Sequence, residues 1–336
     1  MKTVDIIIPT YKPDGKFIEL LQKLKKQSYS VSRIIIVNTE EKYYNRLIYG
    51  TNFFEESKNV DVYHVSKKEF DHGNTRNFGV KRSNADYFIC MTQDAMPNDQ
   101  ELISNLVKAV EQAKIAVAYG RQLPEKNCNV LEQYTRTFNY PDFSFIKDLD
   151  DLPKLGIKTY FCSNVCAIYN RDIFEKLGGF ISHTIFNEDM IYAARAVKAG
   201  YRIAYAADAR VVHSHNYTYM DQFHRNFDLG VSQADNPEIF ADIPSESEGI
   251  RMIQETAKYL IKNGHRNKIL SLYLQSGFKY LGYRMGCNYK KLPRKIVLKC
   301  TMNRDYWRLY GLKHASAGID ASKGYGRTEA ELRKRK

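Results

Sequence analysis

Long apolar runs are absent from this sequence of 336 residues. A membrane-spanning helix needs roughly 18 or more consecutive apolar residues, and no stretch approaches that length. The apolar run near the N-terminus ends at Pro9 after only a few residues, and no small-residue cleavage site follows it. This segment therefore predicts a first buried strand and not a secretory signal peptide.

Cysteine is also scarce. The six cysteines are scattered along the chain and lack the dense spacing of a disulfide framework. Cys162 and Cys166 lie four residues apart, but no second pair at zinc-binding spacing accompanies them. We expect buried free thiols and a cytosolic protein.

Glycine-rich phosphate-binding loops are missing as well. No G-x-G-x-x-G follows the first predicted strand, and no G-x-x-x-x-G-K-[ST] occurs anywhere. These absences argue against dinucleotide binding of the common type and against a P-loop. The turn PTYKPDG after the first strand has no glycine cradle, so a phosphate group would need cations or a metal ion instead.

Negative charge is scarce in the last quarter of the chain. Residues 251–336 contain 21 Lys and Arg but only 5 Asp and Glu, a net charge of +16, whereas the whole chain carries +13. The first 250 residues are therefore nearly neutral, at about −3. This distribution predicts a near-neutral body with a strongly basic extension.

The apolar pattern of the body alternates between strand and helix. Runs rich in β-branched residues predict five strands, over 4–10, 33–39, 60–66, 86–91 and 115–120. Helical spacing lies between them, including a helix over 75–83. The alternation predicts a mostly parallel sheet with helices on both faces. Ligands bind such sheets at the carboxyl ends of the strands, where Thr10 and Asp94 lie.

Polar side chains suited to chemistry gather in three further segments. They are Asp71, His72, Asn74 and Arg76 in EFDHGNTRNFG, Glu188 and Asp189 in FNEDM, and His213 and His215 in VVHSHNYT. Each segment has a purely structural alternative. Asn-Glu-Asp before a helix is a common N-cap pattern, alternate histidines often lie on a surface, and a lone Asp or Arg is common in turns and on surfaces.

The chain resembles glycosyltransferase family 2 in the order and spacing of DIIIPTYKP, HGNTRNFG, MTQDAMP, SNVCAIYNRDIFEKLGGF, NEDM and VVHSHNYT. The resemblance covers residues 3–220. It implies an α/β, mostly parallel, Rossmann-like fold of the A type that binds a nucleotide diphospho-sugar. The FDHGNTRN and TQDA variants are similar to those of the bacterial rhamnosyltransferase branch. That branch implies inverting transfer of L-rhamnose from dTDP-rhamnose to a growing, polyprenyl-diphosphate-linked cell-surface polysaccharide.

A metal site is implied by the same resemblance. The family typically has Asp-x-Asp at the end of the fourth strand, where a divalent cation neutralises the departing diphosphate. The matching residues here are Gln93, Asp94 and Ala95. The resemblance therefore implies Asp94 as a ligand, with His213 near metal and diphosphate. Imidazole suits Mn²⁺ better than Mg²⁺, and the missing second carboxylate leaves the strictness of metal dependence open.

Inversion requires a proton acceptor beside the acceptor hydroxyl. The resemblance implies Asp189 as this base, with Glu188 orienting it or contacting the acceptor. It also implies a set of nucleotide-sugar contacts, in which Glu40 stands where the family usually has an Asp after the second strand. These contacts are Thr10, Tyr11, Glu40, His72, Asn74, Arg76, Gln93 and Asp94.

The basic extension interleaves aromatic and aliphatic residues with Lys and Arg over 267–300. No recognised module for nucleic acids frames it, so nucleic acid is not an expected partner. Helices that pack on the core and helices that bind an anionic membrane surface both account for the pattern. We expect a catalytic domain over 1–230, a helical basic region over 231–312 on the acceptor or membrane side, and a flexible basic tail over 313–336. The expected location is cytoplasmic, on the inner face of the cell membrane.

Two alternatives stay open at this point. The donor could be another nucleotide sugar, such as UDP-glucose or UDP-galactose. From a different class, the chain could be a noncatalytic scaffold that binds glycans or membranes. Gln93 and Ala95 would then mark a degenerate site.

Overall fold

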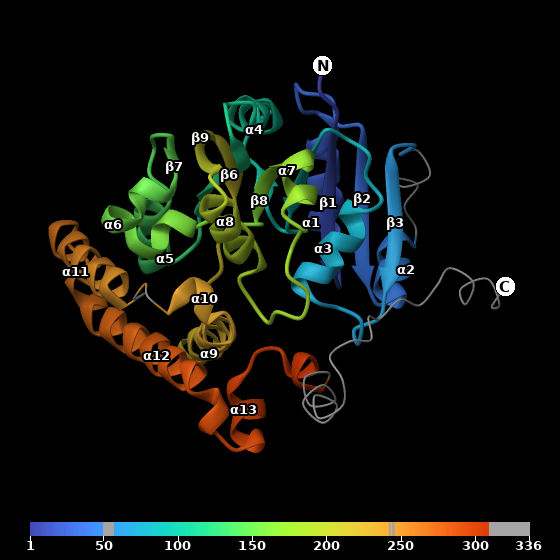
Figure 1. The fold of residues 1–336 in the computed structure, drawn as a ribbon. Helices are drawn as coiled ribbons and strands as arrows, with labels where there is room; N and C mark the ends of the chain where they lie inside the picture. Colours follow the sequence, from blue (N-terminus) through green and yellow to red (C-terminus); the bar gives the residue numbers. More distant parts are fainter. Residues whose placement is uncertain (50–56, 242, 244–245, 309–336) are drawn as a thin grey trace.

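The computed structural model of the chain describes residues 1–49, 57–241, 243 and 246–308. Within that part of the chain, nine strands form one sheet in the order β3-β2-β1-β4-β8-β6-β9-β5, and β7 pairs with β9 outside this path. Helices cover the sheet, and a group of C-terminal helices lies beside one of its edges (Figure 1).

The strands are β1 (Val4–Tyr11), β2 (Arg33–Thr39), β3 (Val60–Val65), β4 (Tyr87–Met91), β5 (Met96–Pro97), β6 (Ile115–Leu123), β7 (Phe145–Lys147), β8 (Cys166–Asn170) and β9 (Arg202–Val212). The α-helices are α1 (Gly15–Lys25), α2 (Glu41–Ile48), α3 (His72–Val80), α4 (Leu102–Val110), α5 (Val130–Asn139), α6 (Leu152–Leu155), α7 (Arg171–Lys176), α8 (Glu188–Lys198), α9 (Tyr219–Asp235), α10 (Pro237–Phe240), α11 (Glu246–Lys262), α12 (Ile269–Cys287) and α13 (Arg294–Cys300). Short 3₁₀ helices are η1 (Leu149–Asp151), η2 (Gly156–Tyr160), η3 (Arg266–Lys268) and η4 (Tyr289–Lys291).

The half of the sheet built from β1 to β4 is parallel. β2 lies between β3 and β1, and β1 also pairs with β4. Ile6 aligns with Ile34 on one side and with Ile89 on the other, and all three are fully buried. Parallel strands covered on both faces consist of continuous apolar runs, which makes them readable in a sequence. The four strands predicted in this half are confirmed to within one residue at each end.

The other half of the sheet is mixed. β8 runs antiparallel to both of its neighbours, β4 and β6. β6 and β9 are parallel to each other, and β5 and β7 run antiparallel to β9. The fifth predicted strand continues beyond residue 120 to the end of β6 at Leu123, and β8 is not among the predicted strands. The predicted fold class, a mostly parallel α/β sheet with C-terminal helices, is confirmed.

Two apolar clusters attach helices to the two faces of the sheet. Ile6 and Ile8 of β1 point to one face, where α1 buries Phe17 and Leu20 against them. Ile7 points to the opposite face, in the cluster that also contains residues of α3, α7 and α8. Burial of one such side chain contributes about 1.5–3 kcal/mol. The sheet is therefore a rigid base for the loops at its edge.

The start of α3 differs from the prediction. The helix begins at His72, three residues before the expected start at Thr75. Asp71 explains the earlier start because its side chain accepts a hydrogen bond from the Asn74 backbone N–H at 2.7 Å and caps the helix. The cap places His72 and Asn74 in the first turn.

The carboxyl ends of β1, β2, β3, β4, β6 and β9 meet at one edge of the sheet, because these strands share one direction. The C-terminal helices α9, α12 and α13 lie toward this edge, which is the lower one in Figure 1. Loops that follow the strands and side chains of these helices can therefore form one site.

Cys162 and Cys166, four residues apart in the sequence, are buried free thiols, as predicted.

Three glycines bring α9 and α12 into backbone contact. A Cβ atom added at Gly282 or Gly286 of α12 would overlap the carbonyl oxygen of Phe223 or Phe227, respectively, on α9. Gly230 of α9 meets the backbone of α12 in the same way. The two helices are thereby held as one unit.

The C-terminal region is helical, as predicted. α12 ends at Cys287, and α13 begins directly after Pro293, with η4 between the two helices. The predicted domain boundary after residue 230 falls inside α9, and the division into domains remains a prediction. Across the described ranges, no helix has the length and apolar character needed to cross a membrane. The tail predicted over 313–336 lies outside the described residues.

Replacement of Gly286 by alanine is expected to lower the free energy of unfolding by about 1–3 kcal/mol, the usual cost of overpacking. The added methyl group would push α12 away from α9. Gly277→Ala on the same helix is the matched control, because nothing lies within 4 Å of a Cβ atom there. Helix propensity makes this control neutral or stabilising by up to about 1 kcal/mol. Urea unfolding measures both variants, and equal losses would contradict the close packing.

Candidate active site

The end of β9 is held between two other strands. Val212 pairs with Leu123 of β6 on one side and with Met96 of β5 on the other. Asp94 lies two residues before Met96, and His213 directly follows Val212. The pairing of these three strands therefore brings Asp94 and His213 together from distant positions in the sequence.

Asp94 contacts two histidines. Its Oδ1 lies 3.6 Å from His213 Nε2, and its Oδ2 lies 3.5 Å from His215 Nε2. One ligand atom from each of the three side chains lies within 4.8 Å of the other two. The sequence prediction names Asp94 and His213 as metal ligands and omits His215. The sequence indicates His215 as a ligand only through its position two residues after His213.

The surroundings of these three residues (the Asp94 triad) favour an ionised carboxylate. Burial by itself would raise the pKa of Asp94, but interactions with His213 and His215 outweigh it and lower the pKa below its ordinary value. Burial, and then the neighbouring His213, lower the pKa of His215. A carboxylate and two imidazoles this close together could hold a divalent cation, with imidazole favouring Mn²⁺ over Mg²⁺.

A second acidic group stands at the start of α8. Asn187, with a left-handed φ of 64°, turns the chain into the helix, and Glu188 and Asp189 occupy its first turn. Negative charge is favoured there because free backbone N–H groups point out of a helix N-terminus. The Asn187 side chain makes no capping hydrogen bond. Asn187 is therefore the N-cap residue by position, as the structural alternative expects, but its side chain does not cap the helix.

Glu188 is buried in an ion pair with Arg76 of α3. Arg76 Nη1 lies 3.1 Å from Glu188 Oε1, and the two side chains are 8% and 7% exposed. The same carboxylate oxygen accepts a hydrogen bond from Asn164 Nδ2 at 3.0 Å. Burial opposes ionisation of Glu188, but Arg76, followed by His72 and Asn164, lowers its pKa below the ordinary value. Glu188 is therefore charged at neutral pH.

Asp189 is half-buried beside this charge. Its Oδ2 accepts a hydrogen bond from the Asn164 backbone N–H at 2.9 Å, and its Oδ1 accepts one from the Met190 backbone N–H at 2.8 Å. Burial and the adjacent Glu188 raise the pKa of Asp189 to about 7. A carboxylate with this proton affinity and a fixed orientation is suited to accept a proton at neutral pH.

Asn164 joins the two carboxylates. Its backbone N–H serves Asp189 and its side-chain amide serves Glu188, while its Oδ1 accepts a hydrogen bond from Tyr169 Oη at 2.7 Å. Asn164 is 3% exposed, so these partners are fixed in place. The residue lies within the SNVCAIYN segment that carries the family resemblance, but no local sequence signal indicates this role.

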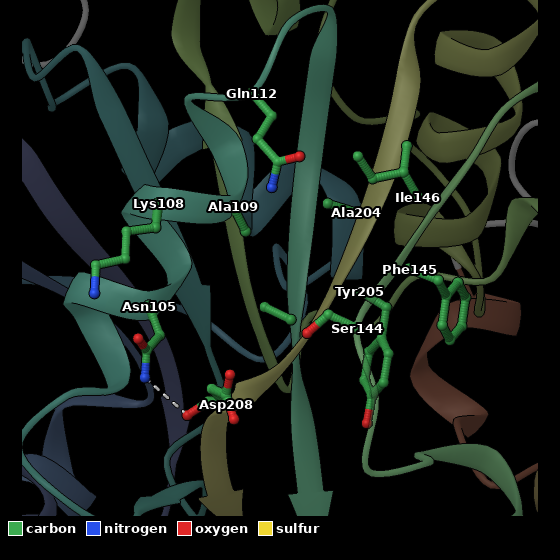
Figure 2. A pocket seen from close by; sticks show the side chains of 11 residues that line it. Asn105, Lys108, Ala109, Gln112, Ser144, Phe145, Ile146, Ala204, Tyr205 and Asp208 are labelled. Atoms are coloured by element: carbon green, nitrogen blue, oxygen red, sulfur yellow. Dashed lines mark hydrogen bonds between the residues drawn. The ribbon is translucent and has the colours of Figure 1, made fainter.

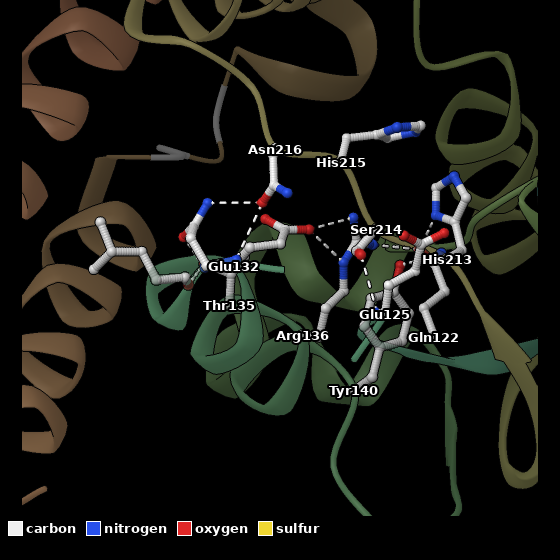
Figure 3. A network of polar contacts seen from close by, with 12 residues as sticks. Gln122, Glu125, Glu132, Thr135, Arg136, Tyr140, His213, Ser214, His215 and Asn216 are labelled. Carbon is white, nitrogen blue, oxygen red and sulfur yellow. Dashed lines mark hydrogen bonds and ion pairs between the residues drawn. The ribbon is translucent and has the colours of Figure 1, made fainter. Parts of the chain in front are cut away.

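Gln122 connects the Asp94 triad to the segment that holds Glu188 and Asp189, and Figure 3 shows it beside His213, Arg136 and Tyr140. It lies near the end of β6, and its Oε1 is 3.0 Å from His213 Nδ1. Its Nε2 donates a hydrogen bond to Ser163 Oγ at 3.0 Å, and Ser163 immediately precedes Asn164. One buried glutamine therefore links His213 to Ser163, the sequence neighbour of the residue that holds both carboxylates.

Three of the residues predicted to contact the nucleotide sugar lie at the ends of β1 and β4. Thr10 is buried, and its Oγ1 donates a hydrogen bond to Asn38 Oδ1 at 3.1 Å. The Tyr11 backbone N–H donates to Gln93 Oε1 at 2.8 Å, and Gln93 Nε2 donates to the Tyr11 carbonyl oxygen at 3.1 Å. Gln93, at the position of the family's first Asp, therefore ties β1 to the loop after β4.

The remaining predicted contacts are divided between two places. Glu40, with a φ of 66°, accepts a hydrogen bond from the Lys67 backbone N–H at 2.8 Å at the end of β2. The His72 carbonyl oxygen accepts a hydrogen bond from Arg76 Nη1 at 2.9 Å, and burial lowers the pKa of its imidazole. Asn74 is exposed in the first turn of α3. His72 therefore lies beside Arg76 and the carboxylate pair formed by Glu188 and Asp189. Glu40 lies apart from them, at the end of β2, and contacts Lys67.

Arg225 of α9 is a further cation near the site, and the sequence does not single it out. Its guanidinium carbon lies 4.6 Å from the centre of the Phe186 ring and 5.8 Å from that of Tyr217. The Tyr217 ring lies 5.0 Å from the His215 ring, and Phe186 directly precedes the Asn-Glu-Asp triplet. Arg225 therefore lies between the histidines and the acidic pair. It forms no ion pair with any other described residue, so it can bind an anionic group.

A separate hollow of about 430 Å³ lies between α4, β7 and β9 (Figure 2). Asn105, Lys108, Tyr205 and Asp208 are among the residues that line it. None of the predicted site residues lines this hollow, so it is not part of the candidate active site.

Comparison with known proteins gives a consistent result. The profile of Glycosyl transferase family 2 matches residues 5–178. O-antigen chain rhamnosyltransferase RfbN of Salmonella typhimurium is 38% identical over 306 residues, which cover 90% of this chain and 96% of RfbN. O-antigen chain rhamnosyltransferase WbaN of Salmonella anatum is 37% identical over 310 residues, which cover 91% of this chain and 96% of WbaN.

The fold is similar to that of mannosyltransferase PcManGT from Pyrobaculum calidifontis, solved in complex with GDP-Man and Mn²⁺. The TM-score is 0.53 and the sequence identity is 14%, over 94% of this chain and 87% of PcManGT. At this identity the similarity concerns the fold, and it agrees with the arrangement of the sheet and of the C-terminal helices.

Proposed function

Because the chain belongs to glycosyl transferase family 2, we propose that it transfers L-rhamnose from dTDP-rhamnose, with inversion at the anomeric carbon, to a growing O-antigen polysaccharide. Membership of the family makes the protein a glycosyltransferase. The sugar and the class of acceptor are supported by the two Salmonella rhamnosyltransferases, which are 38% and 37% identical over 90% and 91% of the chain. A polyprenyl-diphosphate-linked saccharide is the form of acceptor that we propose.

Asp189 is the general base in this proposal. The acceptor hydroxyl has a pKa far above neutral pH and must lose its proton as its oxygen attacks the anomeric carbon. The proton passes to the Asp189 carboxylate, which two backbone N–H groups orient. The observation that carries the proposal is this carboxylate, whose pKa is raised to about 7 by burial and by the adjacent Glu188.

Glu188, Arg76 and Asn164 support the base in this proposal. The negative charge of Glu188 increases the proton affinity of Asp189. Arg76 compensates the charge of Glu188, which would otherwise be costly to bury. Asn164 holds both carboxylates in one orientation.

The departing nucleoside diphosphate needs positive charge around it. A divalent cation, Mn²⁺ or Mg²⁺, would be held by Asp94, His213 and His215 and would neutralise the negative charge that builds on the diphosphate. Arg225, which no described carboxylate compensates, would contact a phosphate directly. We assign the nucleoside to the ends of β1 and β2, where the predicted contacts begin.

Turnover tests the reaction and the base. The purified protein, with Mn²⁺ and a lipid-linked acceptor, is expected to release more nucleoside diphosphate from dTDP-rhamnose than from UDP-glucose or UDP-galactose.

Asp189→Asn is expected to lower kcat roughly 10²–10⁴-fold, the usual contribution of a general base. Donor affinity, measured by calorimetry, should be unchanged. Wild-type turnover by Asp189→Asn would exclude this base, and release from none of the three donors would exclude the proposed reaction.

Membrane attachment is a further part of the proposal, and one face of α12 supports it. Leu270 is 70% exposed, Tyr273 57% and Leu281 54%, and with Leu274 and Tyr280 they recur along one side of the helix. Exposed basic residues follow in the chain: Arg284, Lys290, Lys291, Arg294 and Lys295. We assign this face to the anionic inner surface of the cell membrane, where a lipid-linked acceptor is met.

Vesicle sedimentation tests this attachment. A triple variant, Leu270→Ser, Leu274→Ser and Leu281→Ser, is expected to bind phosphatidylglycerol vesicles at least roughly tenfold more weakly, because apolar area is lost from the contact. Leu149→Ser is the matched control, since Leu149 is also exposed, at 46%, but lies in η1. Added salt should weaken binding of the wild-type protein by screening its basic residues. Equal sedimentation of the triple variant and the control would rule out this face of α12.

A further inference from the structure

Every hydrogen-bond donor and acceptor of the Gln122 side chain has a partner. Its Nε2 donates hydrogen bonds to Tyr140 Oη at 2.5 Å and to Ser163 Oγ at 3.0 Å. Its Oε1 accepts a hydrogen bond from Arg136 Nη1 and faces His213 Nδ1 at 3.0 Å. A primary amide offers two donor hydrogens and two acceptor lone pairs. The four contacts use all of them, in a position that is 2% exposed.

Arg136 decides which way the Gln122 amide lies. A guanidinium has donors only, so the amide oxygen must face it, and the reverse orientation would set an NH₂ group against a cation. Arg136 is itself fixed on α5, where its Nε and Nη2 both lie 2.7 Å from Glu132 Oε1 (Figure 3). The chemistry of the neighbours therefore determines the orientation of this buried amide.

The amide orientation in turn determines the tautomer of His213. An amide oxygen can only accept a hydrogen bond, so His213 Nδ1 must carry the hydrogen. In the neutral imidazole the lone pair is then on Nε2. This is the atom that lies 3.6 Å from Asp94 Oδ1 and that belongs to the Asp94 triad.

We propose that Gln122 and Arg136 are positioning residues that hold His213 in the Nδ1–H tautomer and so present its Nε2 lone pair to a divalent cation. The hydrogen-bond partner of a ligating histidine typically contributes roughly 10–100-fold to metal affinity. The cation is part of the proposed function, and this inference rests on it there. The tautomer, however, is a property of the chain alone.

Nuclear magnetic resonance tests the tautomer directly. Two-bond ¹H–¹⁵N correlation spectra of the full chain, labelled with ¹⁵N-histidine, distinguish Nδ1–H from Nε2–H in the absence of donor, acceptor and metal. The His213 signals are assigned by their loss in His213→Gln. We expect the Nδ1–H tautomer in the wild-type protein, in spectra recorded at a pH above the range in which histidine is protonated, so that the imidazole is neutral. Binding of Mn²⁺ alone, measured by electron paramagnetic resonance, provides the second readout.

Substitutions of Gln122 separate acceptor chemistry from packing. Gln122→Met has a similar size but no acceptor, so the Nδ1–H tautomer should no longer dominate and Mn²⁺ affinity should fall roughly 10–100-fold. Gln122→Glu retains oxygen atoms toward Arg136 and His213, and the hydroxyls of Tyr140 and Ser163 can turn to donate. This variant should therefore keep the wild-type tautomer and most of the Mn²⁺ affinity.

Substitutions of Arg136 test the orientation of the amide. Arg136→Met frees the Gln122 amide to turn and donate to His213 Nδ1, which should move the hydrogen to Nε2. Arg136→Lys keeps a donor-only cation and should retain the Nδ1–H tautomer. Gln133→Met, on the same helix, is the matched control, because the Gln133 amide donates to the Cys128 carbonyl oxygen. Thermal unfolding shows whether each variant is folded.

Two results would overturn the inference. One is a wild-type His213 whose neutral imidazole carries its hydrogen on Nε2. The other is a folded Gln122→Met in which both the tautomer and the Mn²⁺ affinity are unchanged. Neither readout requires a sugar donor, so a tautomer that depends on Gln122 supports the inference even if none of the tested donors is turned over and the proposed reaction fails.

Discussion

The buried ion pair between Arg76 and Glu188 is the contact on which the site depends. It joins α3, in the parallel half of the sheet, to the start of α8. Loss of one partner of such a pair leaves an uncompensated charge and typically costs about 3–5 kcal/mol. With the pair intact, Glu188 remains ionised, and the pKa of Asp189 rises because of its burial and the charge beside it. Two adjacent carboxylates thus acquire different proton affinities, the usual way in which one site separates a charged group from a base.

A second constraint, the pairing of Val212 with both β5 and β6, builds the other half of the site. It places the Asp94 triad at the same sheet edge as the carboxylate pair, and Gln122 connects the two groups. The C-terminal helices complete this arrangement. Arg225 on α9 faces the site, while α12, held to α9 through glycines, presents its exposed apolar side outward. One pair of helices therefore links the site to an exposed apolar surface.

Much of the sheet could be predicted, because strands such as β1 and β2 are buried on both faces and consist of continuous apolar runs. β8 could not be predicted in the same way, since its position and direction depend on β4 and β6, which are not its neighbours in sequence. Asp94, Asp189 and His213 lie in segments that resemble the family, so they could be named as candidates. Gln122 and Asn164 lack a local signal for their roles. The Gln122 contacts join positions 41 and 91 residues apart, and such contacts exist only in the folded chain.

The central claim is that Asp189 is a base whose proton affinity depends on the charge of Glu188, and the pH dependence of kcat/KM tests it most directly. In the wild-type protein, kcat/KM should fall as the pH is lowered through about 7, because a protonated Asp189 cannot accept the acceptor's proton. Glu188→Gln removes the adjacent charge, so the fall in its kcat/KM on the acid side of the pH profile (the acid limb) should move to lower pH. Glu175→Gln, at an acid on α7 whose side chain is 63% exposed, should leave the limb in place. A wild-type acid limb at about pH 4, the ordinary range of an aspartate, or an unshifted limb in Glu188→Gln, would contradict the claim.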